Sequence, residues 1–142
     1  MKNKNIILLV FDGLRADKLS CLGYNKRDTT PFLNSIIDKC VVFNKHYTCA
    51  VRSLSAHISL VTGVHPHIHK ACDDWSAYLE DFPTIFQIAQ KKGYYTFGIS
   101  TDNPFLRRET GFIRGFDKYI QIVKSNKQIS NGPFLLKKID EN

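Results

Sequence analysis

The sequence has little of what marks several large classes of protein. Its four cysteines, Cys21, Cys40, Cys49 and Cys72, include no CxxC pair, which disfavours a zinc ribbon. No apolar stretch approaches the roughly 18 residues that a membrane-spanning helix needs. The N-terminal run IILLVF is too short for a typical signal-peptide core, and no small-residue cleavage site follows it. We therefore expect a soluble, cytoplasmic protein with reduced thiols and no membrane span.

Long runs of one charge are also absent, although the chain is basic overall. It carries 20 Lys and Arg against 13 Asp and Glu, a net charge of +7. Such a charge suits an anionic partner, which could be nucleic acid, an anionic lipid, or a phosphate or sulfate ester. The sequence contains no block of like charges and no helix-turn-helix or RNP pattern. We therefore expect an anionic ester, and a basic anion- or nucleic-acid-binding module is the weakest alternative.

The order of the apolar patterns predicts an α/β fold. With 142 residues, 43% of them hydrophobic, the chain suits one domain with a substantial core. The continuous apolar run at 5–11 is typical of a strand buried on both faces of a parallel sheet. The later patterns predict a helix at 29–40, a strand at 41–49, a helix from Ser53 to a stop at Gly63, a loop at 65–71, a helix at 82–93 and a strand at 94–100. This alternation predicts a mostly parallel central sheet flanked by helices.

One acidic side chain lies where an α/β sheet binds its ligands. Asp12 directly follows the first predicted strand, at the carboxyl edge of the sheet. A carboxylate there is a good ligand for a hard divalent cation. The alternative is an ordinary turn, because Asp before Gly13 is a common turn pair. This feature alone leaves both interpretations open.

The stretch RSLSAHISLVTG places a cluster of hydroxyls and one histidine at the start of a predicted helix. Ser53, as the expected N-cap, would lie at the positive end of the helix dipole, beside backbone N–H groups that can hold a phosphate or sulfate. His57 lies one turn later and could support the Ser53 hydroxyl, which is a weak nucleophile alone. The alternative is a capping serine and a packed histidine. We expect Ser55 and Ser59 to make local hydrogen bonds.

Three histidines at a spacing of two follow in the stretch HPHIHK. In a strand, His65, His67 and His69 would share one side and could bind zinc. However, Pro66 breaks such a strand, and no Cys or acidic residue stands at ligand spacing. We therefore favour a loop here.

Three collinear motifs resemble the opening of the sulfatase family, within the alkaline-phosphatase-like superfamily. The first, NIILLVFDGLRADKLSCLGYNKRDTTPFLNSI, is similar to the family's apolar strand, metal-binding Asp, LRxD segment and TPxLxxL helix. The second, SLSAHISLVTGVHPHIHKA, resembles the nucleophile helix and the T-G-x-x-P-x-x-H segment that ends it. The third, ETGFIRGFDKY, resembles the GF-x-x-GFD-x-[YF] segment. The resemblance covers residues 5–119 in family order.

The resemblance implies roles for three side chains. Asp12 matches the first metal ligand and Ser53 matches the nucleophile. In true sulfatases that nucleophile is a Cys or Ser oxidised to formylglycine within C/S-x-P/A-x-R. Here Ser55 stands at the Pro or Ala position and His57 at the Arg position, so we do not expect formylglycine. The chain is more similar to a TLPSHASLFTG-type subgroup with a Thr nucleophile, in which His57 would orient or polarise the bound ester.

Other positions depart from the family pattern. The family's paired Asp-Asp is Asp12-Gly13 here, and the sulfate-gripping GKWH segment has no counterpart. The family's late strand that ends in Asp-His or Asp-Asn is not reached. We therefore expect 1–142 to be the N-terminal part of a sulfatase-like domain, with a motif-bearing core at 1–119 and a weakly patterned end at 120–142 that holds one plausible strand.

The resemblance implies a metal-dependent hydrolase or transferase that acts on phosphate or sulfate esters through a Ser nucleophile. The absence of the formylglycine and GKWH signatures favours phosphate esters. The divalent cation could be Ca, Mg, Mn or Zn. We expect the enzyme to need a C-terminal half, which a second chain could supply. The alternative is a truncated or split remnant without activity.

Overall fold

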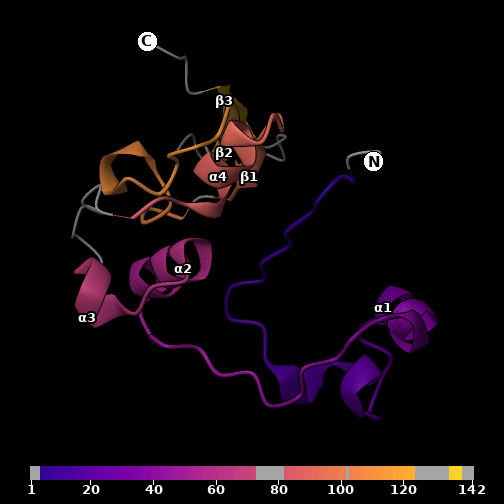
Figure 1. Ribbon diagram of the computed structural model, residues 1–142. Helices are drawn as coiled ribbons and strands as arrows, with labels where there is room; N and C mark the ends of the chain where they lie inside the picture. Colours follow the sequence, from indigo (N-terminus) through magenta and orange to yellow (C-terminus); the bar gives the residue numbers. More distant parts are fainter. Residues whose placement is uncertain (1–3, 73–81, 102, 124–134, 139–142) are drawn as a thin grey trace. The chain divides into compact units, whose positions relative to one another are not determined.

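The computed structural model describes residues 4–72, 82–101, 103–123 and 135–138 (Figure 1). The chain divides into two compact units, Met1–Tyr47 and Thr48–Asn142. Among the described residues, the first unit contains one short α-helix and several 3₁₀ turns, and the second contains the other helices and all the strands. No helix among the described residues has the length and apolar character needed to cross a bilayer. All four cysteines are free thiols.

Residues 5–11 of the first unit form no strand, which corrects the prediction of a buried strand there. Ile7 and Phe11 are 82% and 68% exposed. A strand needs a neighbour that exchanges backbone hydrogen bonds with it, and the described part of this unit contains no other strand. The strand predicted at 41–49 is wrong for the same reason, and Val41 within it is exposed.

One short helix orders the first unit. α1 spans Pro31–Ile36 and continues as a 3₁₀ turn, η3, over Ile37–Lys39. The helix predicted at 29–40 is therefore confirmed, although it is shorter and its last turn is tightened. Two 3₁₀ turns precede it, η1 at Ala16–Lys18 and η2 at Ser20–Leu22.

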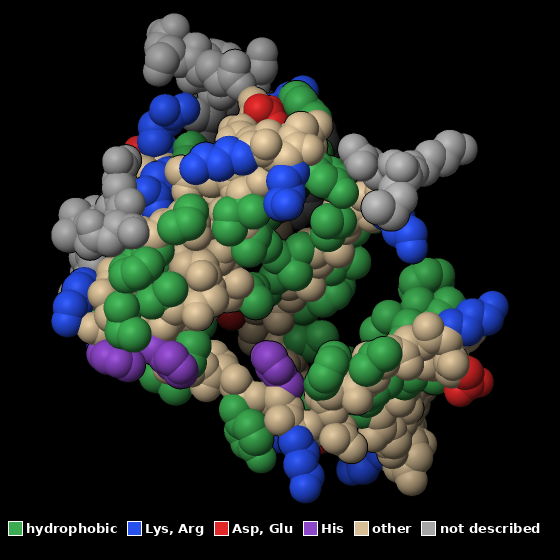
Figure 2. Space-filling model, viewed as in Figure 1, with side chains coloured by type: hydrophobic (Ala, Val, Ile, Leu, Met, Phe, Trp, Pro, Cys, Tyr) green, Lys and Arg blue, Asp and Glu red, His purple; other side chains and the backbone are tan. Residues whose placement is uncertain are grey.

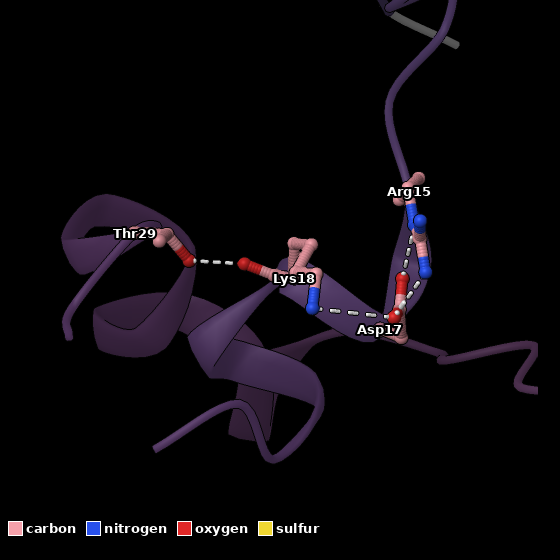
Figure 3. Close-up of polar contacts among 4 residues, drawn as sticks. All are labelled: Arg15, Asp17, Lys18 and Thr29. Atoms are coloured by element: carbon pink, nitrogen blue, oxygen red, sulfur yellow. Dashed lines mark hydrogen bonds and ion pairs between the residues drawn. The ribbon is translucent and has the colours of Figure 1, made fainter. Parts of the chain in front are cut away.

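The hydroxyl of Ser20 organises the loop between η2 and α1. Ser20 Oγ donates to Asp28 Oδ1 (2.7 Å) and lies 2.9 Å from Thr30 Oγ1. The backbone N–H of Ser20 donates to Thr29 Oγ1 (3.0 Å), and that hydroxyl donates to the carbonyl of Lys18 (2.6 Å; Figure 3). These bonds hold both ends of the loop together.

The LRAD segment of the first motif forms an ion pair on the surface (Figure 3). Arg15 Nε and Nη2 donate to the two carboxylate oxygens of Asp17, at 2.9 and 2.7 Å. The hydrogen bonds from Arg15 hold the pKa of Asp17 below its usual value. Because both side chains are more than half exposed, the pair contributes little to stability.

Helix α2, drawn beside α3 in Figure 1, supplies several fully buried side chains to the second unit. It spans Ser53–Thr62 and presents Leu54, Ile58 and Val61 to the core, each at most 1% exposed. Their spacing of four and three residues places them on one helix face. Gly63 ends the helix as predicted, at φ 71°.

The segment at 65–71, predicted as a loop, contains a helical turn. α3 spans Pro66–His69. Pro66 argues against a strand, but its fixed φ suits the first turn of a helix, which explains the difference. The turn ends at Lys70, whose φ of 62° is unusual for a residue with a Cβ.

Helix α4, Ile85–Lys91, confirms the helix predicted at 82–93, with Thr84 as its N-cap. A capping box begins the helix, because Gln87 N donates to Thr84 Oγ1 (3.2 Å) while Thr84 N donates to Gln87 Oε1 (2.9 Å). The Thr84 hydroxyl also donates to the carbonyl of Arg114 (3.0 Å). This bond joins the helix to the segment that carries the third motif.

The described sheet has three strands, in the order β1-β2-β3 (Figure 1). β1 spans Phe97–Ser100 and pairs in parallel with β2, Lys118–Val123. β3, Leu135–Lys138, pairs antiparallel with β2. The expected mostly parallel sheet is thus reduced to one parallel pair within the described residues. In the weakly patterned end at 120–142, residues 124–134 and 139–142 lie outside the described residues.

Candidate active site at the start of helix α2

Ser53 lies in the first turn of α2. Arg52 occupies the N-cap, one position earlier than predicted, so Ser53 is the first residue of the helix. The first helical hydrogen bond joins Ala56 N to the carbonyl of Arg52 (3.0 Å), which leaves the N–H groups of the first turn without acceptors inside the helix. The first turn contains no acidic side chain. The helix dipole and these N–H groups therefore favour an anion beside Ser53.

His57 is in direct contact with the backbone of Ser53. The Nδ1 atom of His57 lies 2.7 Å from the carbonyl oxygen of Ser53. Because a carbonyl only accepts, Nδ1 carries a proton and donates it to Ser53. The side chain is 8% exposed, and its ring is perpendicular to that of Phe112, with centroids 6.0 Å apart. The structure therefore brings together the two residues of this helix that the sequence predicted as catalytic.

Ser55 and Ser59 of the cluster hold the end of α3 and the residues that follow it. Ser55 Oγ donates to the carbonyl of Ala71 (2.6 Å), and Ser59 Oγ lies 2.8 Å from Nε2 of His69. Ala71 N donates to Nδ1 of His69 (3.1 Å), so the His69 proton is on Nε2 and is donated to Ser59. Burial lowers the pKa of His69 and keeps the ring neutral. The expectation that Ser55 and Ser59 make hydrogen bonds is confirmed.

The described residues do not complete a metal site. They contain no group of three or more His, Cys, Asp or Glu side chains that could hold a metal ion. His65 and His67 are exposed and stack on each other at 5.9 Å, while His69 is committed to Ser59. Asp12 lies in the expected turn in the first unit and is exposed. It offers one carboxylate, whereas a calcium ion takes about six to eight oxygen ligands.

The third motif has a structural role that the sequence pattern did not reveal. The carboxylate of Asp117 accepts hydrogen bonds from Thr96 N (2.6 Å), Thr96 Oγ1 (2.8 Å) and Gln90 Nε2 (2.8 Å), which lower the pKa of Asp117. The ring of Phe116 lies 4.0 Å from that of Phe86. These contacts fix the entry to β2. The GFD motif singled out this segment in the sequence, but only the hydrogen bonds show that Asp117 has a structural role.

Comparisons with known proteins agree with the motifs. A protein-family model described as Sulfatase matches residues 4–138. The chain also matches the solved structure of BT4656 in complex with its substrate D-glucosamine-2-N,6-O-disulfate, with a TM-score of 0.60 and 19% sequence identity. That match covers 86% of this chain and 25% of the BT4656 chain, so the chain spans a quarter of the length of that protein. At this identity the likeness shows a shared fold. None of the curated proteins matches.

Proposed function

The chain belongs to the sulfatase family, and from this membership we propose that it acts on a sulfate or phosphate ester through Ser53 as the nucleophile. The observation that carries the proposal is the place of Ser53 in the first turn of α2, with His57 bonded to its carbonyl. The basic net charge of +7 also favours an anionic substrate. The substrate of BT4656, a sulfated glucosamine, is an ester of this class.

The proposed reaction has two steps. Ser53 Oγ loses its proton and attacks the sulfur or phosphorus, and the bond to the leaving oxygen breaks. That oxygen gains a proton and departs as the alcohol, which leaves a covalent seryl ester. Water then releases the group in a hydrolase, or an acceptor alcohol takes it in a transferase. The N–H groups of the first turn of α2 would stabilise the negative oxygens, and His57 would orient or polarise the ester. Formylglycine has no part in this proposal, because Ser55 and His57 replace the Pro or Ala and the Arg of its motif.

The finer assignments belong to the same proposal. We place the chain near the subgroup with a Thr or Ser nucleophile, and its fold with the alkaline-phosphatase-like architecture. Family members generally use a metal ion, and Asp12 would supply one ligand to a divalent cation. Calorimetric titration with Ca²⁺, Mg²⁺, Mn²⁺ and Zn²⁺ tests this assignment, because Asp12→Asn should weaken binding while Asp38→Asn, a change at another exposed carboxylate of the first unit, should not. Equal binding by both variants would refute the role of Asp12.

An ester assay tests the nucleophile. The full chain is incubated with an aryl phosphate and an aryl sulfate, each with divalent cations, and the release of the phenol is followed. We expect Ser53→Ala to abolish turnover and Ser35→Ala, an exposed serine of the first unit, to leave it unchanged. Intact-mass measurement of quenched reactions should show the added sulfuryl or phosphoryl group in the wild type and not in Ser53→Ala. Turnover that survives Ser53→Ala would contradict the proposal, and the preferred ester identifies the substrate class.

A second proposal is that the chain is inactive alone and needs a further polypeptide. The exposed apolar run that includes Ile7 and Phe11 motivates it, as do Phe97 and Ile99 of β1, which are 49% and 59% exposed. A folded wild-type chain that turns over neither ester and binds an apolar dye would favour this proposal. Binding of nucleic acid is less favoured, since Lys and Arg side chains are scattered over the described part of the face in Figure 2.

A further inference from the structure

Phe112 of the third motif reaches the candidate site from a distant part of the chain. It lies between η4, Arg108–Thr110, and β2, more than fifty residues after His57 in sequence. The side chain is 7% exposed and belongs to the core beside α2. Its ring is nearly perpendicular to the His57 ring, at 85°, with centroids 6.0 Å apart. This is the edge-to-face geometry that aromatic pairs prefer.

The segment around Phe112 is fixed from both sides. On one side, Thr110 Oγ1 donates to the carbonyl of Phe105 (2.8 Å), and Gly111 turns the chain at φ 74°. On the other side, the carbonyl of Arg114 accepts from Thr84 Oγ1 (3.0 Å). The Phe112 ring is thus held by backbone contacts that do not involve α2. The Phe112 ring can therefore provide a fixed packing surface for the side chain of His57.

Two contacts define the orientation of His57. Nδ1–H donates to the carbonyl of Ser53, and the ring packs against Phe112. The hydrogen bond alone fixes one nitrogen but leaves rotation of the side chain possible, whereas the aromatic contact restricts that rotation. We propose that Phe112 is a positioning residue of the active site, which holds His57 in the orientation in which Nδ1–H donates to the carbonyl of Ser53. The catalytic part of this inference rests on the proposed function.

Phe112 also fills the core, so the test must separate orientation from packing. Phe112→Leu removes the ring and keeps an apolar side chain. Phe86→Leu is the matched control, because it removes another ring of the same cluster, whose partner is Phe116 at 4.0 Å rather than His57. Both variants should lose stability to urea, and Phe112→Leu should lose more because its ring is more deeply buried than that of Phe86. Only Phe112→Leu should change the orientation and the ring tautomer of His57.

The first readout is spectroscopic and needs no substrate. Long-range proton–nitrogen NMR spectra of the full chain at about pH 8, where an ordinary imidazole is neutral, report which ring nitrogen carries the proton. We expect a pure Nδ1–H form for His57 in the wild type and in Phe86→Leu. In Phe112→Leu we expect shifted ring resonances and a mixture of tautomers. A His57 spectrum unchanged by Phe112→Leu would overturn the inference, whether or not the chain hydrolyses esters.

The second readout is kinetic. From the strength of an aromatic pair we expect Phe112→Leu to lower kcat roughly 2- to 10-fold with KM unchanged, and Phe86→Leu to leave both unchanged. An altered His57 spectrum with unaltered kcat would overturn the catalytic part of the inference. Failure of the proposed function is distinct, since it appears as turnover that does not depend on Ser53. If the wild-type chain has no turnover, the NMR result alone decides whether Phe112 positions His57.

Discussion

Replacement of Gly115 by alanine tests the packing of the third motif against α4. Gly115 has a φ of 87°, where a residue with a Cβ is strained. A Cβ at this position would also lie against the backbone N of Gln87, 2.7 Å from Gln87 Cγ and 2.9 Å from the carbonyl carbon of Phe86. The backbone of α4 is held by its capping box and cannot move aside easily. We therefore expect Gly115→Ala to combine backbone strain with overpacking.

The magnitude follows from these two effects. The left-handed conformation costs a residue with a Cβ about 1–2 kcal/mol. Overpacking of a well-packed site costs about 1–3 kcal/mol. Together they predict a loss of roughly 2–5 kcal/mol in the free energy of unfolding, a large part of the total stability of a typical domain.

Two other glycines separate the two effects. Gly93 has a φ of 81°, but a Cβ there would meet no other atom within 4 Å, so Gly93→Ala should show the strain alone. Gly98 has an ordinary φ, but a Cβ there would lie 2.6 Å from Tyr119 Cδ2, so Gly98→Ala should show the overpacking alone. Urea unfolding followed by circular dichroism measures all three variants. If Gly115→Ala is no more destabilising than Gly93→Ala, the close approach of Gly115 to α4 is wrong.

Three further predictions concern local contacts. Lys70→Gly should raise the free energy of unfolding by up to about 1 kcal/mol, because glycine adopts a φ of 62° without strain. Lys70→Ala should not raise it, and equal urea midpoints for the two variants would contradict this reasoning. Burial lowers the pKa of His69, so its contribution to stability should be complete above about pH 6.5 and decline as the pH falls towards the lower folded value. Thermal unfolding across this range should show a shallower acid decline for His69→Gln. Thr84→Val should lose about 1 kcal/mol as the cap is removed, and Thr84→Ser should retain it; calorimetry that finds the two equally stable would rule out the capping box.

Helices α1, α2 and α4 could be predicted from the sequence because their signals are local. Helix ends are marked by the fixed φ of Pro31, the capping side chain of Thr84 and the left-handed φ of Gly63, and α2 ends at Gly63 as the sequence predicted. The strand predicted at 94–100 is confirmed as β1, Phe97–Ser100, but the strands predicted at 5–11 and 41–49 are not. A strand depends on a partner distant in sequence, and the apolar run at 5–11 has none among the described residues.

The contacts of the candidate site also differ in how far they could be predicted, according to whether they are local in sequence. The sequence predicted that His57 lies one helical turn after Ser53, but it did not predict the bond of His57 Nδ1 to the backbone carbonyl of Ser53. The contact of Phe112 with His57 joins residues far apart in the chain, and no local pattern could reveal it. The three histidines of HPHIHK show a local pattern whose function differs from the one it suggests. Their spacing resembles that of metal ligands, but His69 is buried and accepts a hydrogen bond from the backbone N–H of Ala71.

The Ser20 network has a consequence for the order in which the chain folds. Its hydrogen bonds join Ser20 to residues 8 to 14 positions away, whereas Thr84 bonds to a residue 30 positions away and Thr96 to one 21 positions away. Closing a short loop loses less entropy than closing a long one, and chains emerge from the ribosome at about 5–20 residues per second. The first unit can therefore fold during synthesis, before β2 has left the ribosome, whereas the second unit must wait for its C-terminal strands.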